Sequence, residues 1–107
     1  MNYRKGYYYE KKTVSELRKR GAIFTVESRG SHGVVDIVAV YPDGSIELIQ
    51  VKSGKKMNIS IKERKELATL VALNPYIRIA IWYWKKYQQT PTVYYVDKAG
   101  RLYHQNW

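Results

Sequence analysis

The sequence predicts an α/β domain in which helices flank a mixed central β-sheet, with the element order αβββαββ. Two kinds of segment support this prediction. Several stretches of strand length are rich in β-branched and aromatic residues and are bounded by turn residues. Two longer stretches carry the apolar spacing or the capping residues of helices.

The first predicted helix covers residues 7–20. Its apolar residues Tyr7, Val14 and Leu17 recur at helical spacing, and Gly21 suits the position just after a helix. A first strand, residues 22–28, is expected to follow directly.

The middle of the chain predicts a β-hairpin. Residues 34–41 and 45–52 both have strand composition, and Pro42-Asp43-Gly44 between them is a turn sequence. Residues 29–33, which precede the hairpin, are typical of a flexible turn because they contain two glycines and a serine.

A second helix is predicted over residues 61–73. Ser60 and Glu63 match the capping box that starts many helices, and Asn74-Pro75 should end this one. Two further strands are expected over residues 77–84 and 92–97. A turn at residues 98–100 then leads into a short basic and aromatic tail, residues 101–107.

Composition narrows the class of protein. The 107 residues suit one domain, and 19 Lys and Arg against 9 Asp and Glu give a formal charge of +10, which favours an anionic partner such as nucleic acid. Without cysteine the chain has no disulfide, no thiolate zinc site and no cysteine nucleophile. No apolar run is long enough to cross a bilayer, so a soluble, cytoplasmic protein without a membrane role is expected.

Four polar residues break the pattern of the elements that carry them. Glu10 shares a helix face with Val14 and Leu17, and Asp36 interrupts an otherwise apolar strand. Gln50 and Lys52 share one face of the next strand, beside Asp36 if the hairpin register is ordinary. We therefore expect Glu10, Asp36, Gln50 and Lys52 to converge.

This combination points to metal-assisted hydrolysis of phosphodiesters. Carboxylate and amide oxygens suit Mg²⁺, which lowers the pKa of a bound water and offsets charge on a phosphate. Lys52 would orient that water or stabilise the transition state. The structural alternative is a satisfied salt bridge, for example between Asp36 and Lys52, with Gln50 hydrogen-bonded beside it.

These residues resemble the PD-(D/E)XK nuclease superfamily, and more specifically the archaeal-type Holliday junction resolvases. The resemblance runs over most of the chain, in order and approximate spacing, through Arg4-Lys5-Gly6, Glu10-Lys11, Gly30-Ser31, Val35-Asp36-Ile37-Val38-Ala39, Ile49-Gln50-Val51-Lys52 and Lys55-Lys56. It implies a restriction-endonuclease-like fold in a single nuclease domain, residues 1–107. It also implies a homodimeric, Mg²⁺-dependent endonuclease that cuts four-way DNA junctions symmetrically and needs no small-molecule cofactor; Mn²⁺ is expected to substitute.

The resemblance also implies roles for individual residues. Asp36, Gln50 and the main-chain carbonyl of Val51 would hold the metal, with Glu10 as the acidic residue of the first helix. Lys52 would be the catalytic lysine, and Ser31 a loop serine required for cleavage. The phosphate contacts would come from Arg4, Lys5, Lys11, Arg29, Lys55 and Lys56.

Two departures from the family pattern leave alternatives open. Members usually carry Glu where this chain has Gln50, which removes one negative charge and should weaken metal binding. Glu27 lies near a position that is usually basic, and Arg29 is a candidate substitute. The alternatives are another PD-(D/E)XK endonuclease, of restriction or repair type, and a non-catalytic DNA-binding module whose site degenerated at Gln50.

The aromatic residues and the composition carry two smaller expectations. Most of the 11 tyrosines are expected in the core, and Trp82 and Trp84, which share a strand face, in the core or a dimer interface. The absence of cysteine and the abundance of Tyr, Lys and Arg are typical of a protein from a thermophile or from a virus of a thermophile.

Overall fold

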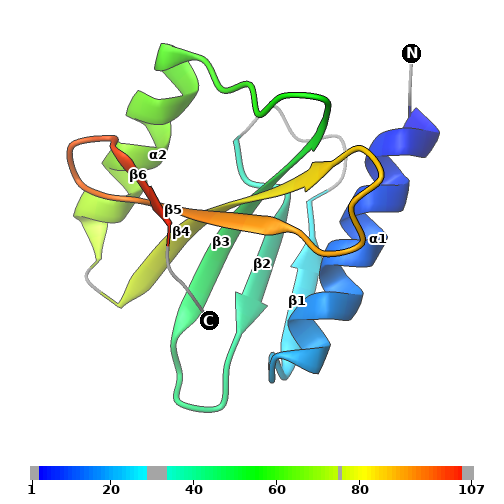
Figure 1. Ribbon diagram of the computed structural model, residues 1–107. Helices are drawn as coiled ribbons and strands as arrows, with labels where there is room; N and C mark the ends of the chain where they lie inside the picture. The colour runs from blue at the N-terminus through cyan, green and yellow to red at the C-terminus, as the bar shows by residue number, and fades with distance from the viewer. Residues whose placement is uncertain (1–2, 29–33, 75, 105–107) are drawn as a thin grey trace.

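The computed structural model describes residues 3–28, 34–74 and 76–104, with side chains from residue 7 onward. The predicted order of elements is confirmed, with one more strand at the end (Figure 1). The elements are α1 (Tyr3–Lys19), β1 (Phe24–Glu27), β2 (Ile37–Val40), β3 (Ile46–Gly54), α2 (Ile61–Leu73), β4 (Ile77–Lys85), β5 (Thr92–Val96) and β6 (Leu102–His104).

All the strands belong to one mixed sheet whose order follows the chain, from β1 at one edge to β6 at the other. Neighbours pair antiparallel except β3 and β4, which are parallel because the crossover through α2 returns the chain to the same end of the sheet. The predicted hairpin of β2 and β3 is confirmed. Its turn is closed by Tyr41, whose N–H donates to the Ser45 carbonyl at 3.0 Å, and Gly44 adopts the positive φ of 85°.

The structure corrects two boundaries. The predicted tail contains β6, which pairs with Tyr94–Val96 of β5 because its backbone groups continue the ladder at the sheet edge. The first helix begins at Tyr3 rather than at residue 7. Tyr7 is the first apolar residue of the helical pattern, whereas a helix can extend through polar residues that such a pattern does not mark.

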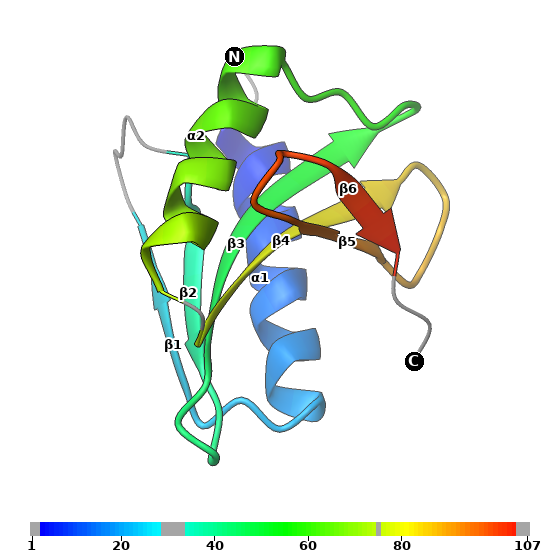
Figure 2. The same cartoon turned by 90° about the vertical axis from the view of Figure 1, so that its left-hand side faces the viewer.

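Helices α1 and α2 cover opposite faces of the sheet (Figures 1 and 2). Side chains of α1 pack with one set of alternate strand residues, which includes Ile49 and the buried Trp82 and Trp84. Leu67 of α2 packs with the other set, on the face that carries Leu48. Because successive strand residues point to opposite faces, each position of β3 belongs to one helix layer or the other.

A chain of hydrogen bonds fixes α1 to β4. The buried hydroxyl of Thr13 donates to the Tyr9 carbonyl at 2.7 Å, and the indole N–H of Trp84 donates to the Thr13 hydroxyl at 2.8 Å. Lys12 lies 4.8 Å above the Trp84 ring. The expectation that Trp82 and Trp84 belong to the core is thereby confirmed for both residues.

The most buried carboxylate is one that the sequence pattern did not single out. Glu47 is 1% exposed, and the Trp82 indole N–H donates to it at 3.0 Å while the Arg78 guanidinium lies 3.7 Å away. Burial raises the pKa of Glu47 despite these contacts. Glu47 faces α1 with Ile49, so it takes part in the core rather than in the candidate site.

The expectation that most tyrosines lie in the core is only half right. Among the tyrosines whose side chains are described, Tyr83 and Tyr95 are buried, and Tyr9, Tyr41 and Tyr94 are partly buried and pack against the core. An equal number are exposed on α1, in the loops and on β6. Exposed tyrosines are Tyr7, Tyr8, Tyr76, Tyr87 and Tyr103.

We predict that Thr13→Val lowers the free energy of unfolding by about 1–3 kcal/mol, because the Trp84 indole N–H loses its partner in a buried place. Urea denaturation of both proteins measures the difference. Thr69→Val is the matched control: its exposed hydroxyl also donates to the carbonyl four residues earlier, and the change should cost less than about 0.5 kcal/mol. Equal losses in the two variants would contradict the prediction.

Candidate active site at the carboxyl end of β3

The pairing of β2 with β3 places Asp36 beside Gln50. Ile37 pairs with Ile49, and just before it the Asp36 N–H also donates to the Ile49 carbonyl at 2.8 Å, so the regular ladder ends at Ile37 and Asp36 lies alongside the Ile49–Val51 segment. Gln50 and Lys52 alternate with Ile49 and therefore belong to the face that α2 covers. Asp36 is close enough to this face for the charges of Lys52 and Glu63 to act on it.

The side chain of Asp36, just before β2 begins, acts as a hydrogen-bond acceptor for the backbone of β3. Its Oδ2 accepts a hydrogen bond from the Val51 N–H at 2.8 Å. Burial raises the pKa of Asp36, and the Glu63 carboxylate acts in the same direction, while the Val51 N–H and the charge of Lys52 oppose them. The result is a half-buried carboxylate held at a defined place, where a bound cation would favour its ionised form.

The structure adds Glu63, on the first turn of α2, to this group. Its Oε2 accepts hydrogen bonds from Gln50 Nε2 at 2.8 Å and from Lys52 Nζ at 3.0 Å. Lys52 thus forms its ion pair with Glu63, and the salt bridge to Asp36 considered above is not the one observed. Asp36, Gln50, Lys52 and Glu63 are called the β3–α2 cluster below.

Glu63 is also half of the capping box of α2. Its Oε1 accepts from the Ser60 N–H at 3.2 Å, and the Ser60 hydroxyl accepts from the Glu63 N–H at 3.1 Å. Although partial burial raises the pKa of Glu63, hydrogen bonds from Lys52, the Ser60 backbone and Gln50 lower it to about 2. The side chain is held at both oxygens and stays ionised at neutral pH.

Sequence reasoning identified Glu63 only as a cap, because the capping box accounted fully for that residue type at that position. The sequence did contain a signal that Glu63 lies near Gln50 and Lys52. These two residues face the side of the sheet that the crossover helix must cover, and only a short loop separates β3 from the first turn of that helix.

One oxygen of the cluster has no hydrogen-bond partner. Gln50 is only 7% exposed, and its Oε1 is buried and unpaired among the residues that the structure describes. Buried amide oxygens normally accept a hydrogen bond or bind an ion. With Asp36, Glu63 and this amide, the donor set consists of oxygens, which is the preference of Mg²⁺.

Glu10 lies on α1, whose apolar side chains pack on the opposite face of the sheet from Gln50 and Lys52. Within the described ranges, no three acidic, histidine or cysteine side chains are close enough to hold one metal ion. The ligand role of Glu10 therefore stays a prediction.

The residues expected to contact phosphates have different surroundings. Lys11 forms an ion pair with Glu27 at 2.9 Å, and this contact raises the pKa of the lysine. Lys55 and Lys56 are exposed and follow the carboxyl end of β3 directly. Ser31 and Arg29 lie outside the described residues, as do the side chains of Arg4 and Lys5.

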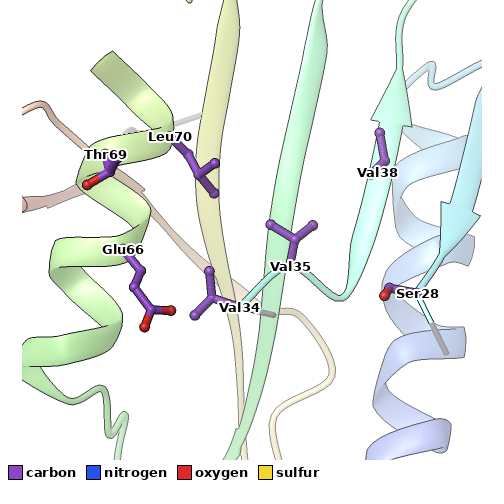
Figure 3. A pocket seen from close by; sticks show the side chains of 7 residues that line it. All are labelled: Ser28, Val34, Val35, Val38, Glu66, Thr69 and Leu70. Atoms are coloured by element: carbon purple, nitrogen blue, oxygen red, sulfur yellow. The ribbon is translucent and has the colours of Figure 1, made fainter. Parts of the chain in front are cut away.

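A groove next to the cluster separates α2 from β2 and the end of β1 (Figure 3). Its volume is about 550 Å³, and Glu66 and Leu70 of α2 face Val34 and Val35 across it. The whole lining comprises Ser28, Val34, Val35, Val38, Glu66, Thr69 and Leu70.

In the part of the chain that the structure describes, no helix is long and apolar enough to cross a membrane.

Comparison with known proteins identifies a family and similar solved structures. The family model of the archaeal Holliday junction resolvases matches residues 1–100. The fold is similar to a solved Holliday junction resolvase of the hyperthermophilic archaeon Archaeoglobus fulgidus, with a TM-score of 0.65 and 20% identity over 89% of this chain and 74% of that one. The expected restriction-endonuclease-like fold is confirmed by this likeness. No match is found among the curated proteins.

The pH dependence of stability should reveal the ionised Glu63. Because its pKa is lowered from 4.5 to about 2, its stabilisation is complete above pH 4.5 and is lost as the pH falls toward 2. We predict that Glu63→Gln flattens the loss of thermal stability over this interval, measured as Tm in a chelator-containing buffer. The other acids titrate in both proteins, so parallel curves for the two would contradict the prediction.

Proposed function

The chain belongs to the archaeal Holliday junction resolvase family, and we propose that this junction-resolving nuclease uses Mg²⁺ to hydrolyse two strands of a four-way DNA junction. The observation that carries the proposal is the gathering of Asp36, Gln50 and Lys52 at the carboxyl end of β3. Nucleases of this kind generally need a divalent metal ion. We take Mg²⁺ as that ion, with Mn²⁺ as a substitute, because the available donors are oxygens.

The metal site that we propose is built on β3 and the residue opposite it. Asp36, the Gln50 amide oxygen and the Val51 carbonyl would hold the ion. The Val51 N–H donates toward Asp36, and in a strand the N–H and C=O of one residue point to the same edge, so this carbonyl also faces Asp36. When bound, the ion lowers the pKa of a water and offsets charge on the scissile phosphate.

Lys52 is the catalytic lysine in this proposal. Its ammonium group is fixed by Glu63 at 3.0 Å, on the same face as Gln50, so it is positioned before the DNA arrives. A cation held there stabilises the negative charge that develops on the phosphate in the transition state. Glu10, on α1, and Ser31, in the segment between β1 and β2, are proposed to complete the site.

The DNA-binding surface is proposed to be basic and insensitive to sequence. Lys55 and Lys56 follow β3 directly, and Arg4, Lys5, Lys11 and Arg29 belong to the same proposal. With a formal charge of +10, the chain has a large excess of cations for phosphate contacts, and junction affinity should fall steeply with salt.

We propose a homodimer, because each chain carries a single proposed site and the proposed reaction cuts two strands. Ile23, Phe24 and Val26 expose apolar side chains at the β1 edge, which is a candidate for such contacts.

We further propose that residues 1–107 form one nuclease domain and that it acts where the DNA is, in the cytoplasm of an archaeon, a bacterium or a virus-infected cell. The thermophile origin remains a compositional prediction.

The direct test is cleavage of a labelled four-way junction with Mg²⁺. We expect paired symmetric nicks, and we expect Asp36→Asn to lower the rate by more than about 100-fold while junction binding persists, because the variant loses a charged ligand but keeps an acceptor for the Val51 N–H. Plain duplex of equal length is the control substrate.

Equal cleavage of junction and duplex would contradict the resolvase activity and favour a restriction- or repair-type endonuclease. Binding without cleavage by the wild-type protein at any divalent metal would favour a DNA-binding module with a degenerate site at Gln50.

A further inference from the structure

The strand residues of the proposed metal site lack net negative charge. Asp36 contributes one negative charge and Lys52 one positive charge, while Gln50 is neutral. A divalent cation gains little from such a set, because its affinity depends on the charge as well as the number of its oxygen ligands. A carboxylate from outside the two strands would therefore strengthen metal binding.

We propose that Glu63, on the first turn of α2, supplies the second carboxylate of the metal site in place of the one that Gln50 lacks. The inference rests on the proposed metal-dependent function. It assigns to Glu63 a role beyond its cap, as a metal ligand contributed by a helix rather than by β3.

The position of Glu63 is the first argument. Its Oε2 lies 2.8 Å from Gln50 Nε2, so the carboxylate is in direct contact with the strand position that carries no charge. The same oxygen lies 3.0 Å from Lys52 Nζ. A negative charge is therefore present beside Gln50, although it comes from another element, and the cluster as a whole carries one net negative charge.

The second argument is the unpaired oxygen of Gln50. The amide donates through Nε2 to Glu63, whereas Oε1 of the same amide is buried without a partner in the described part of the chain. An amide oxygen in this state is under-satisfied by at least one interaction. A cation bound by Asp36 and Glu63 would satisfy it. Mg²⁺ typically takes one or two carboxylates and keeps several waters, so these residues are sufficient.

The third argument is rigidity. The capping box holds Glu63 through Ser60, whose N–H donates to Oε1 at 3.2 Å. One oxygen of the carboxylate is thus bound to the backbone of α2 and the other is directed at β3. A ligand held in this way loses little conformational freedom when the ion binds.

The capping role can be separated from the metal role by one conservative change. Glutamine also completes a capping box, so Glu63→Gln keeps the helix start and the shape of the side chain while removing the charge. Glu66→Gln is the matched control, because it makes the same change on an exposed residue of the same helix, one turn further on.

The experiment measures binding of Mn²⁺ alone, by calorimetry and by the loss of the free-ion EPR signal, and junction cleavage in parallel. We expect Glu63→Gln to weaken Mn²⁺ binding at least about tenfold and Glu66→Gln to leave it unchanged. The double variant Gln50→Glu/Glu63→Gln moves the carboxylate from α2 to β3. It should bind Mn²⁺ within about threefold of the wild-type protein.

Unchanged Mn²⁺ affinity in Glu63→Gln would overturn the inference. So would a loss that the double variant does not recover, because Glu63 would then act by positioning Lys52 and not as a ligand. The inference and the proposed function fail in different ways. If Mn²⁺ binding follows the expected series but the wild-type protein does not cut junctions, the ligand assignment stands and the activity is wrong.

Discussion

The site depends on the place where β2 stops pairing with β3. The regular ladder of the two strands ends at Ile37, and one residue earlier Asp36 contacts β3 twice: its N–H donates to the Ile49 carbonyl and its side chain accepts from the Val51 N–H. The second contact holds a carboxylate at the edge of β3, where a regular strand would offer a main-chain carbonyl. The carboxylate is thereby fixed beside Gln50 and Lys52.

The parallel pairing of β3 and β4 has a second consequence for the site. It requires a crossover, and α2 supplies it on the face that carries Gln50 and Lys52. The first turn of α2 brings Glu63 to that face, where the amide and ammonium groups bind its carboxylate. The charge of Lys52 thus offsets one of the two carboxylate charges of the cluster.

Much of this arrangement follows from the sequence, for identifiable reasons. The turn at Pro42-Asp43-Gly44 fixes the hairpin register, and this register brings Asp36 alongside the Ile49–Val51 segment. Strand alternation then places Lys52 on the same face. The cap of α2 was also predictable, because Ser60 and Glu63 form a local motif that needs no tertiary information.

What could not be predicted depends on contacts between distant elements. The helical spacing of Glu10 showed that it faces the sheet, but not which layer of the sheet α1 would cover. Likewise Glu47 alternates with apolar residues in the same way as a surface residue would, and only its contact with Trp82 distinguishes it. The contacts of Glu63 with Gln50 and Lys52 were not predicted, because the capping box already explained a glutamate at this position.

The most direct measurement is a crystal structure with Mn²⁺, in which anomalous scattering locates the ion without assumptions about its ligands. The account predicts a peak in the β3–α2 cluster, within about 2.0–2.3 Å of carboxylate oxygens of both Asp36 and Glu63. A peak bound to Asp36 with Glu63 still paired to Lys52, or no peak in the cluster at saturating Mn²⁺, would contradict it.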